Sequence, residues 1–277
     1  VGVYDEAGNV ASTTITVPIN APPDPCASTT CASNVLFLPG IEASRLYRPG
    51  AGGGETKLWE PGLLDTLHDL YLNPEGKSVR ADVYTKTGDI VDETPVTGAN
   101  IYKSFIAKMN GLVAAGSVNA WEADPYDWRL SINDILTHGK QTGTHISYID
   151  ATSTPYIIQE LKHLAATSKT GKVTIIAHSN GGLVAKQLTD LLGADAPVLI
   201  DKMIFVAVPQ AGTPAAVAAH MHGYGQAFGG GFAVSKATAR TFASTSPMAY
   251  HLLPSAHYFT QVDTPVISFD ASLPDWI

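Results

Sequence analysis

Short apolar runs recur along the chain and predict buried strands. Four of them are continuous, rich in Val, Ile and Phe, and end at Pro, Gly, Ser or Asp: residues 34–40 (NVLFLPG), 173–178 (VTIIAH), 202–209 (KMIFVAVP) and 264–269 (TPVISF). Runs of this kind suit strands that are buried on both faces of a sheet. A fifth candidate, residues 119–128 (NAWEADPYDW), contains more polar positions.

Segments with apolar residues spaced three and four apart lie between these runs and predict helices. They cover residues 100–116, 154–168 and 181–193. Strands that alternate with helices indicate a mostly parallel sheet with helices on both faces. The predicted fold class is therefore α/β.

Two long segments do not follow this alternation. Residues 42–98 show few helical or strand patterns, which indicates an irregular insertion. Residues 210–247 combine GYGQAFGGGF with many Ala and Thr, which suits a mobile cover. Long insertions of this kind in compact enzymes are often lids over a binding site.

The N-terminal part has a different pattern. Residues 1–20 place the turn sequence DEAGN before the alternating β-branched run STTITVPI. This order is typical of a closing β-hairpin and resembles the end of an immunoglobulin-like β module, with an extended arm as the alternative. Residues 21–33 read as a linker, so the main domain spans residues 34–277.

The linker holds the only two cysteines, Cys26 and Cys31. A metal site would need further ligands nearby, and none are present. We therefore expect a local disulfide and a secreted or extracellular protein, with two free thiols as the alternative.

Composition excludes some classes of function. The 277 residues are 45% hydrophobic, which is enough for one substantial core. Only 15% are charged, the formal net charge is −8 and no basic run occurs, so we expect no nucleic-acid partner. No apolar stretch approaches the roughly 20 residues that span a bilayer.

Ser179 lies between a predicted strand and a predicted helix, in the sequence Ala177-His178-Ser179-Asn180-Gly181. This is the nucleophile elbow GxSxG with alanine at its first position. The small residues two before and two after the serine let strand and helix pass close beneath it. The alternative is a serine that only caps a helix.

Backbone N–H groups near Ser179 predict an oxyanion hole. The amide of Asn180 lies at the helix N-terminus. A second donor in such hydrolases comes from the loop after an early strand, which points to the amide of Ile41, directly after Pro39-Gly40. By itself, Gly40 also fits an ordinary turn.

At this point the chain resembles a family. FLPGIEASRLY, LWEP, ADPYDWRLS, AHSNGGLVAKQL, VAVPQAGTP and LLPSAHYF follow one another as in the lecithin:cholesterol acyltransferase-like lipases, over about residues 34–270. The resemblance implies an α/β-hydrolase fold, Ser179 as nucleophile, and the Ile41 and Asn180 amides as oxyanion donors. It also implies a lid at residues 210–247 and an insertion at 42–98 that meets a lipid surface.

Three further residues gain an interpretation from this resemblance. Trp59 fits an interfacial anchor, and a buried structural tryptophan fits equally well. We interpret Asp127 and Arg129 as structural residues that tie down a loop near the site.

The serine also needs an acid and a base, which follow it in the order acid, then histidine. The acids Asp190, Asp195 and Asp201 are not at the carboxyl ends of strands, where catalytic loops lie. Asp270 does end a strand-like run, but no histidine follows it. We therefore expect the acid and base beyond Ile277, with Asp270 and either His251 or His257 as the in-chain alternative.

The remaining histidines, His220 and His222, have no nearby carboxylate and make a weak metal site, so neither metal nor cofactor is expected. The predicted function is cleavage of carboxylic esters of lipids through an acyl-enzyme on Ser179, with lipid-surface contact. Transfer of the acyl group to an alcohol is the alternative within the same chemistry. A non-catalytic lipid-binding or adhesion module is the alternative from another class.

Overall fold

The structure, a computed structural model, describes residues 2–4, 10–12, 32–61, 67–94, 97–223 and 235–262. Near the N-terminus, β1 (Gly2–Tyr4) and β2 (Val10–Ser12) pair antiparallel, with Gly2 opposite Ser12. The strands flank the predicted turn sequence, so a hairpin is present there, while residues 13–19 of the predicted β-branched run lie outside the described residues. Cys26 and Cys31, in the predicted linker, lie outside the described residues.

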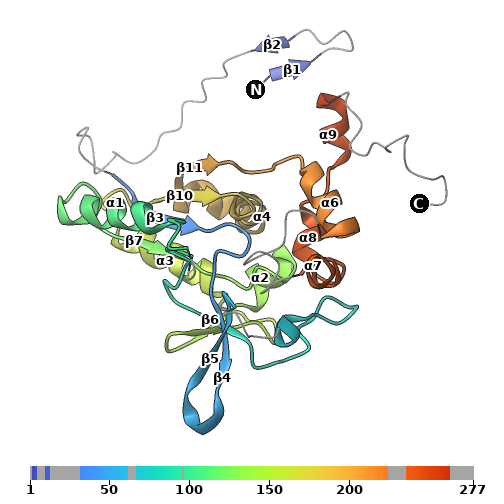
Figure 1. The fold of residues 1–277 in the computed structure, drawn as a ribbon. Helices are drawn as coiled ribbons and strands as arrows, with labels where there is room; N and C mark the ends of the chain where they lie inside the picture. Colours follow the sequence, from blue (N-terminus) through green and yellow to red (C-terminus); the bar gives the residue numbers. More distant parts are fainter. Residues whose placement is uncertain are drawn as a thin grey trace.

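A parallel four-stranded sheet forms the centre of the main domain (Figure 1). Its strand order is β11 (Ile200–Val206), β10 (Val173–His178), β3 (Asn34–Leu38) and β7 (Trp121–Ala123). Ile175 of β10 lies between Leu36 of β3 and Met203 of β11. Three predicted strands are thus confirmed, the fifth shortens to β7, and residues 264–269 lie outside the described residues.

Helices cover both faces of this sheet. Successive side chains of β3 point to opposite faces and pack against different helices. Val35 and Phe37 pack in clusters that contain Phe105 of α1 (Lys103–Ala114). Leu36 and Leu38 belong to the main core, together with buried residues of α3 (Tyr156–Thr167) and α4 (Gly181–Leu192). All three predicted helices are present, and the arrangement is the expected α/β fold, a parallel sheet with helices on both faces.

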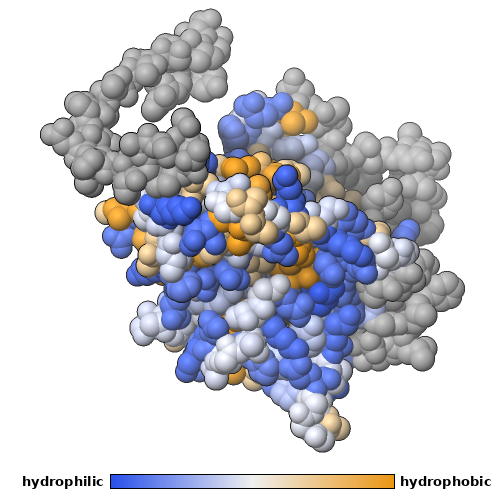
Figure 2. Space-filling model, turned by 90° about the vertical axis from the view of Figure 1, so that its left-hand side faces the viewer, coloured by the Kyte–Doolittle hydropathy of each residue, from blue (hydrophilic) through white to orange (hydrophobic). Residues whose placement is uncertain are grey.

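The strand β11 forms one edge of the central sheet within the described residues, and its apolar residues are exposed. Met203, Ile204 and Val206 keep 38–47% of their surface accessible. Figure 2 shows hydrophobic surface gathered in the upper half of the face that it presents.

The interpretation of residues 42–98 as irregular was wrong. They contain β4 (Leu46–Pro49), β5 (Glu55–Trp59) and β6 (Tyr84–Lys86), with short 3₁₀ helices η1 (Ala51–Gly53) and η2 (Leu67–Leu70). With β8 (Lys140–Thr142) and β9 (His145–Ser147) they form an antiparallel sheet of order β5-β4-β6-β9-β8. No long apolar run marks these strands, because they are short and largely polar, and two of the five come from a later segment.

Short helices occupy much of the region after β11. They are α6 (Pro214–His222), α7 (Lys236–Ala243), α8 (Pro247–His251) and α9 (Ala256–Gln261). The ring of Phe242 in α7 lies 5.6 Å from that of Trp128 in the core. The predicted cover at 210–247 is therefore largely helical where it is described, and α7 is docked on the core.

The remaining helices are α2 (Ile132–His138), α5 (Ala196–Leu199) and the 3₁₀ helix η3 (Gly193–Asp195). In the described ranges, no helix combines the length and the apolar character that a membrane span requires.

Candidate active site

Ser179 lies on a strained turn between β10 and α4. Its φ angle is 53°, a left-handed conformation that residues other than glycine seldom adopt. Its N–H donates to the Val206 carbonyl at 2.9 Å, and its own carbonyl accepts from the Gly182 N–H at 3.1 Å. Strain of this kind persists only where surrounding contacts hold it, and here the two main-chain hydrogen bonds do so.

The glycines after Ser179 are required by close packing. A Cβ on Gly181 would lie 2.4 Å from the Leu38 carbonyl oxygen, and one on Gly182 would lie 2.3 Å from a methyl group of Val208. The first turn of α4 therefore touches the end of β3 directly. Ala177, at the first elbow position, is fully buried on β10, where its single methyl group is accommodated.

The loop after β3 lies against the elbow. A Cβ on Gly40 would lie 3.2 Å from the Ser179 Cβ, so the loop packs closely against the Ser179 side chain. The next N–H, that of Ile41, and the N–H of Asn180 donate no hydrogen bond within the described part of the chain. Two free N–H groups beside one serine are what an oxyanion hole requires.

The Asn180 side chain joins the same two segments. It is fully buried, and its Oδ1 lies 3.1 Å from the Tyr126 hydroxyl, which donates to the Pro39 carbonyl at 2.6 Å. Burial raises the pKa of Tyr126 well above its usual range, so the hydroxyl keeps its proton. Tyr126 thereby connects the end of β3 to the start of α4.

Sequence reasoning did not identify Tyr102 or the role of the His178 side chain. The Tyr102 hydroxyl accepts the Gly40 N–H at 2.9 Å and lies 2.8 Å from the His178 Nδ1. Burial raises the pKa of Tyr102 to about 12 and lowers the pKa of His178. His178 was visible as part of the elbow motif, but nothing in the local sequence links Tyr102 to it.

Glu42, in the same loop, is partly buried. It has a φ angle of 61°, and its carbonyl accepts the Trp59 indole N–H at 2.5 Å. Burial raises the pKa of its carboxyl to about 7. The interpretation of Trp59 as an interfacial anchor was wrong, because its side chain is buried against Trp128, with ring centroids 5.1 Å apart.

Asp127 and Arg129 have the structural role that we predicted. The Arg129 guanidinium donates to both carboxylate oxygens of Asp127, at 2.8 and 2.6 Å, and to the Leu70 carbonyl at 2.9 Å. The Ser246 hydroxyl donates to the Arg129 carbonyl at 2.8 Å. The pair therefore ties the insertion and the segment before α8 to the core.

No side chain in the described ranges hydrogen-bonds the Ser179 hydroxyl. His251 lines a pocket of about 370 Å³ together with Asn133 of α2 and with Leu183 and Asp190 of α4. His257 lies in α9, where its Nδ1 is 3.4 Å from the Thr260 hydroxyl. Asp270 lies outside the described residues, so the acid and base stay a prediction.

Of the two histidines of α6, His220 is partly buried and His222 is exposed. The Nδ1–H of His220 donates to the Ala216 carbonyl at 2.8 Å, and its ring packs edge-on against Tyr250. In the described ranges, no group of three or more His, Cys, Asp or Glu side chains is arranged to hold a metal ion.

Asp124, directly after β7, has a fully buried carboxyl group. Its Oδ1 accepts from the Tyr156 hydroxyl at 3.0 Å, while its Oδ2 has no partner among the described residues. Burial, together with repulsion from Glu160, raises the pKa of Asp124 well above its usual range. The folded protein therefore binds a proton here that the unfolded chain releases.

We expect Asp124→Asn to stabilise the protein at neutral pH. Because the folded pKa is raised, the wild-type carboxyl stabilises the fold fully only below its unfolded pKa, ordinarily 3.8, and this contribution is lost as pH rises. The slope is at most about 1.4 kcal/mol per pH unit. Urea denaturation at pH 5 and pH 8 checks this: the variant's advantage should grow with pH, and an equal change at both values contradicts it.

Residues 61–270, more than half of the chain, match the family model described as "Lecithin:cholesterol acyltransferase". Among solved structures, a chain in the crystal structure of the Tle4–Tli4 complex is similar, with 16% identity and a TM-score of 0.40. The match covers 82% of this chain and 55% of that one, so this chain spans about half the length of the solved relative. No curated protein matches.

Proposed function

The chain belongs to the lecithin:cholesterol acyltransferase family, and from this premise we propose that it cleaves carboxylic esters of lipids through an acyl-enzyme on Ser179. The observation that carries the proposal is the geometry of Ser179, held at a φ angle of 53° with Gly40 packed against it. A nucleophile has to protrude from a strand-to-helix turn of this kind, close to free backbone N–H groups.

The chemistry has two steps. The Ser179 hydroxyl gives its proton to a base and its oxygen attacks the ester carbonyl, while the N–H groups of Ile41 and Asn180 stabilise the oxyanion. The alcohol then leaves with a proton, and the acyl group stays on Ser179. Water releases a fatty acid in the hydrolase reaction, whereas an acceptor alcohol receives the acyl group in the acyltransferase reaction.

Contact with a lipid surface is part of the same proposal. Large apolar side chains are exposed on the helices that follow β11, namely Met221 of α6, Tyr250 of α8 and Phe259 of α9. Apolar groups on a segment of this kind favour adsorption to a lipid interface. We propose that residues 210–247, which include Met221, act as the lid, that Tyr250 and Phe259 lie in the lipid-contacting surface next to it in sequence, and that the protein works outside the cytoplasm with Cys26 joined to Cys31.

The test is covalent labelling with a p-nitrophenyl alkylphosphonate, which forms a stable adduct with an activated serine. We expect one adduct, located by peptide mass spectrometry on Ser179, and no adduct in Ser179→Ala. Ser104→Ala, which removes an exposed serine of α1, serves as the matched control and should label like the wild type. An adduct that persists in Ser179→Ala overturns the assignment of the nucleophile.

A second measurement separates the two outcomes of the acyl-enzyme. The protein is incubated with phosphatidylcholine vesicles, with and without a long-chain alcohol, and the free fatty acid and alkyl ester formed are quantified. Free fatty acid in both samples supports the hydrolase. An alkyl ester that replaces the fatty acid supports the acyltransferase.

A further inference from the structure

The oxyanion loop, defined here as Pro39 to Ala43, contains a glycine at its most constrained position. A Cβ on Gly40 would lie 3.0 Å from the His178 Nδ1 and 3.2 Å from the Ser179 Cβ, so any side chain here would crowd both residues. Glycine is also the residue with the most conformational freedom. Contacts from outside the loop therefore have to fix its two peptide groups.

Both peptide groups of Gly40 are held by hydrogen bonds. The Gly40 carbonyl, which shares a peptide plane with the Ile41 N–H, accepts from the Ala43 N–H at 3.3 Å. The Gly40 N–H, on the other side, donates to the Tyr102 hydroxyl at 2.9 Å. Since the first contact lies within the loop, Tyr102 is the residue from elsewhere in the fold that holds the Gly40 N–H, while Tyr126 holds the Pro39 carbonyl of the same peptide group.

The Tyr102 hydroxyl also sets the state of His178. Its oxygen accepts the Gly40 N–H, so its single proton is available to the His178 Nδ1 at 2.8 Å. The His178 proton then lies on Nε2 and the ring is neutral, in agreement with its lowered pKa. One hydroxyl thus joins the oxyanion loop to the residue directly before Ser179.

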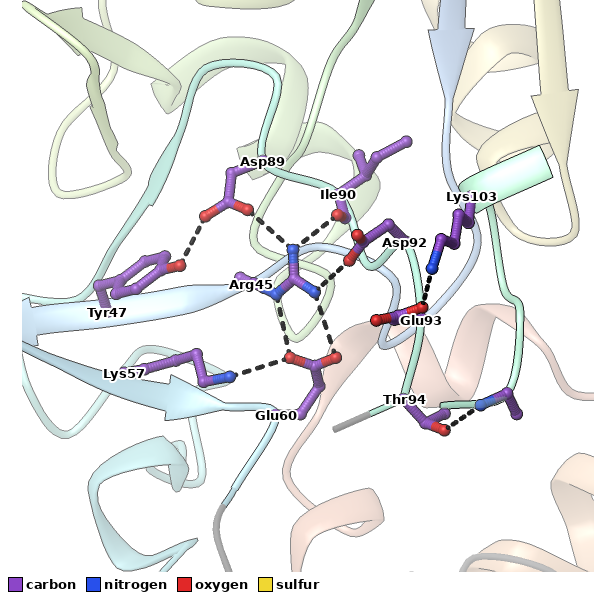
Figure 3. A network of polar contacts seen from close by, with 11 residues as sticks. Arg45, Tyr47, Lys57, Glu60, Asp89, Ile90, Asp92, Glu93, Thr94 and Lys103 are labelled. Carbon is purple, nitrogen blue, oxygen red and sulfur yellow. Dashed lines mark hydrogen bonds and ion pairs between the residues drawn. The ribbon is translucent and has the colours of Figure 1, made fainter. Parts of the chain in front are cut away.

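Backbone hydrogen bonds and ring packing hold Tyr102 itself in place. The Asp92 carbonyl accepts the N–H groups of Ile101, Tyr102 and Lys103 at 2.8–3.0 Å, where α1 begins. The Asp92 carboxylate accepts from Arg45 at 2.7 Å, within the network of carboxylates around Arg45 that Figure 3 shows. The Tyr102 ring packs edge-on against Phe37 of β3, with centroids 4.9 Å apart.

We propose that Tyr102 is a positioning residue for ester cleavage: its hydroxyl holds Gly40 and His178 together and so orients the Ile41 N–H toward the oxyanion formed at Ser179. The inference rests on the proposed function. In this role Tyr102 neither contacts the substrate nor transfers a proton. The effect of removing the hydroxyl should therefore fall on the rate of the chemical step and leave substrate affinity unchanged.

The test replaces Tyr102 by Phe, which keeps the ring that packs on Phe37. We expect kcat for p-nitrophenyl butyrate and the rate of Ser179 phosphonylation to fall about tenfold to a hundredfold, with KM unchanged within twofold, because misplaced catalytic groups lose rate by such factors. The matched control is Tyr156→Phe, which removes another buried hydroxyl hydrogen bond but contacts Asp124. Its kcat should stay within twofold of the wild type.

His178 variants supply a readout that general destabilisation would not produce. His178→Leu removes the acceptor of the Tyr102 proton, whereas His178→Gln offers an amide oxygen in its place and should recover part of the lost kcat. We expect Tyr102→Phe combined with His178→Leu to be no slower than Tyr102→Phe alone, because the two side chains act as one unit.

Several outcomes overturn the inference. They are an unchanged kcat in Tyr102→Phe, an increase in KM without a loss of kcat, an equal loss in Tyr156→Phe, and additive losses in the double variant. A wild-type protein that leaves Ser179 unlabelled is a different result, since it overturns the proposed function and the inference falls with it.

Discussion

Replacing Arg129 by methionine is expected to lower the free energy of unfolding by about 3–5 kcal/mol, because it leaves a buried carboxylate without its cation. Arg129 is fully buried, and Asp127 keeps 2% of its surface accessible. The variant also loses the hydrogen bond to the Leu70 carbonyl, which ties η2 of the insertion to the core. Chemical denaturation followed by circular dichroism measures the loss.

Two further variants test the reason for that loss. Arg129→Met combined with Asp127→Leu removes both charges, and we expect it to be more stable than Arg129→Met alone. Lys77→Met breaks an exposed ion pair with Asp134 and should change stability by less than about 1 kcal/mol. If the double variant is as unstable as the single one, the unpaired charge is not the cause.

Gly181→Ala is the second substitution with a large expected effect. The added methyl group would lie 2.4 Å from the Leu38 carbonyl oxygen and 2.5 Å from that of Pro39. These atoms belong to the backbone at the end of a buried strand, which has little freedom to move. We expect a loss of about 3 kcal/mol, at the upper end of overpacking effects. Phosphonylation of Ser179 should also be lost, since α4 has to shift away from the oxyanion loop.

Gly111→Ala is the matched control for this substitution. Gly111 lies within α1, and among the described residues no atom beyond its chain neighbours and the backbone of its own helix lies within 4 Å of the position that its Cβ would take. Alanine favours a helix interior over glycine by about 0.5–1 kcal/mol, so this variant should be as stable as the wild type or more stable. Thermal unfolding of both variants makes the comparison. A Gly181→Ala protein with wild-type stability and labelling would refute the packing argument.

The central sheet was largely predictable because its signal is local. A strand buried on both faces needs a continuous apolar run, and β3 and β10 have one. The insertion sheet was not predictable in this way. Glu55, Thr56 and Lys57 of β5 are polar and lie outside the core, so the strand is specified by its pairing with β4 rather than by hydrophobic pattern.

The two interpretations left open for Trp59 show the same limit. A tryptophan in a polar, irregular-looking segment fits a lipid-surface anchor as well as a core residue. Its burial follows from its register opposite Leu46 and from the approach of Trp128, which lies far away in the sequence. Neither contact has a local signal.

The sequence by itself determined the elbow around Ser179, because a strand, a small-residue turn and a helix are consecutive in the chain and their chemistry is local. It also indicated Gly40 and Ile41 as the loop that faces the elbow. Only the tertiary structure decided what holds that loop. Tyr102 lies 62 residues from Gly40 and 76 from His178, and a hydrogen bond between such distant groups exists only once the sheet has brought β3 and β10 together and α1 has packed against them.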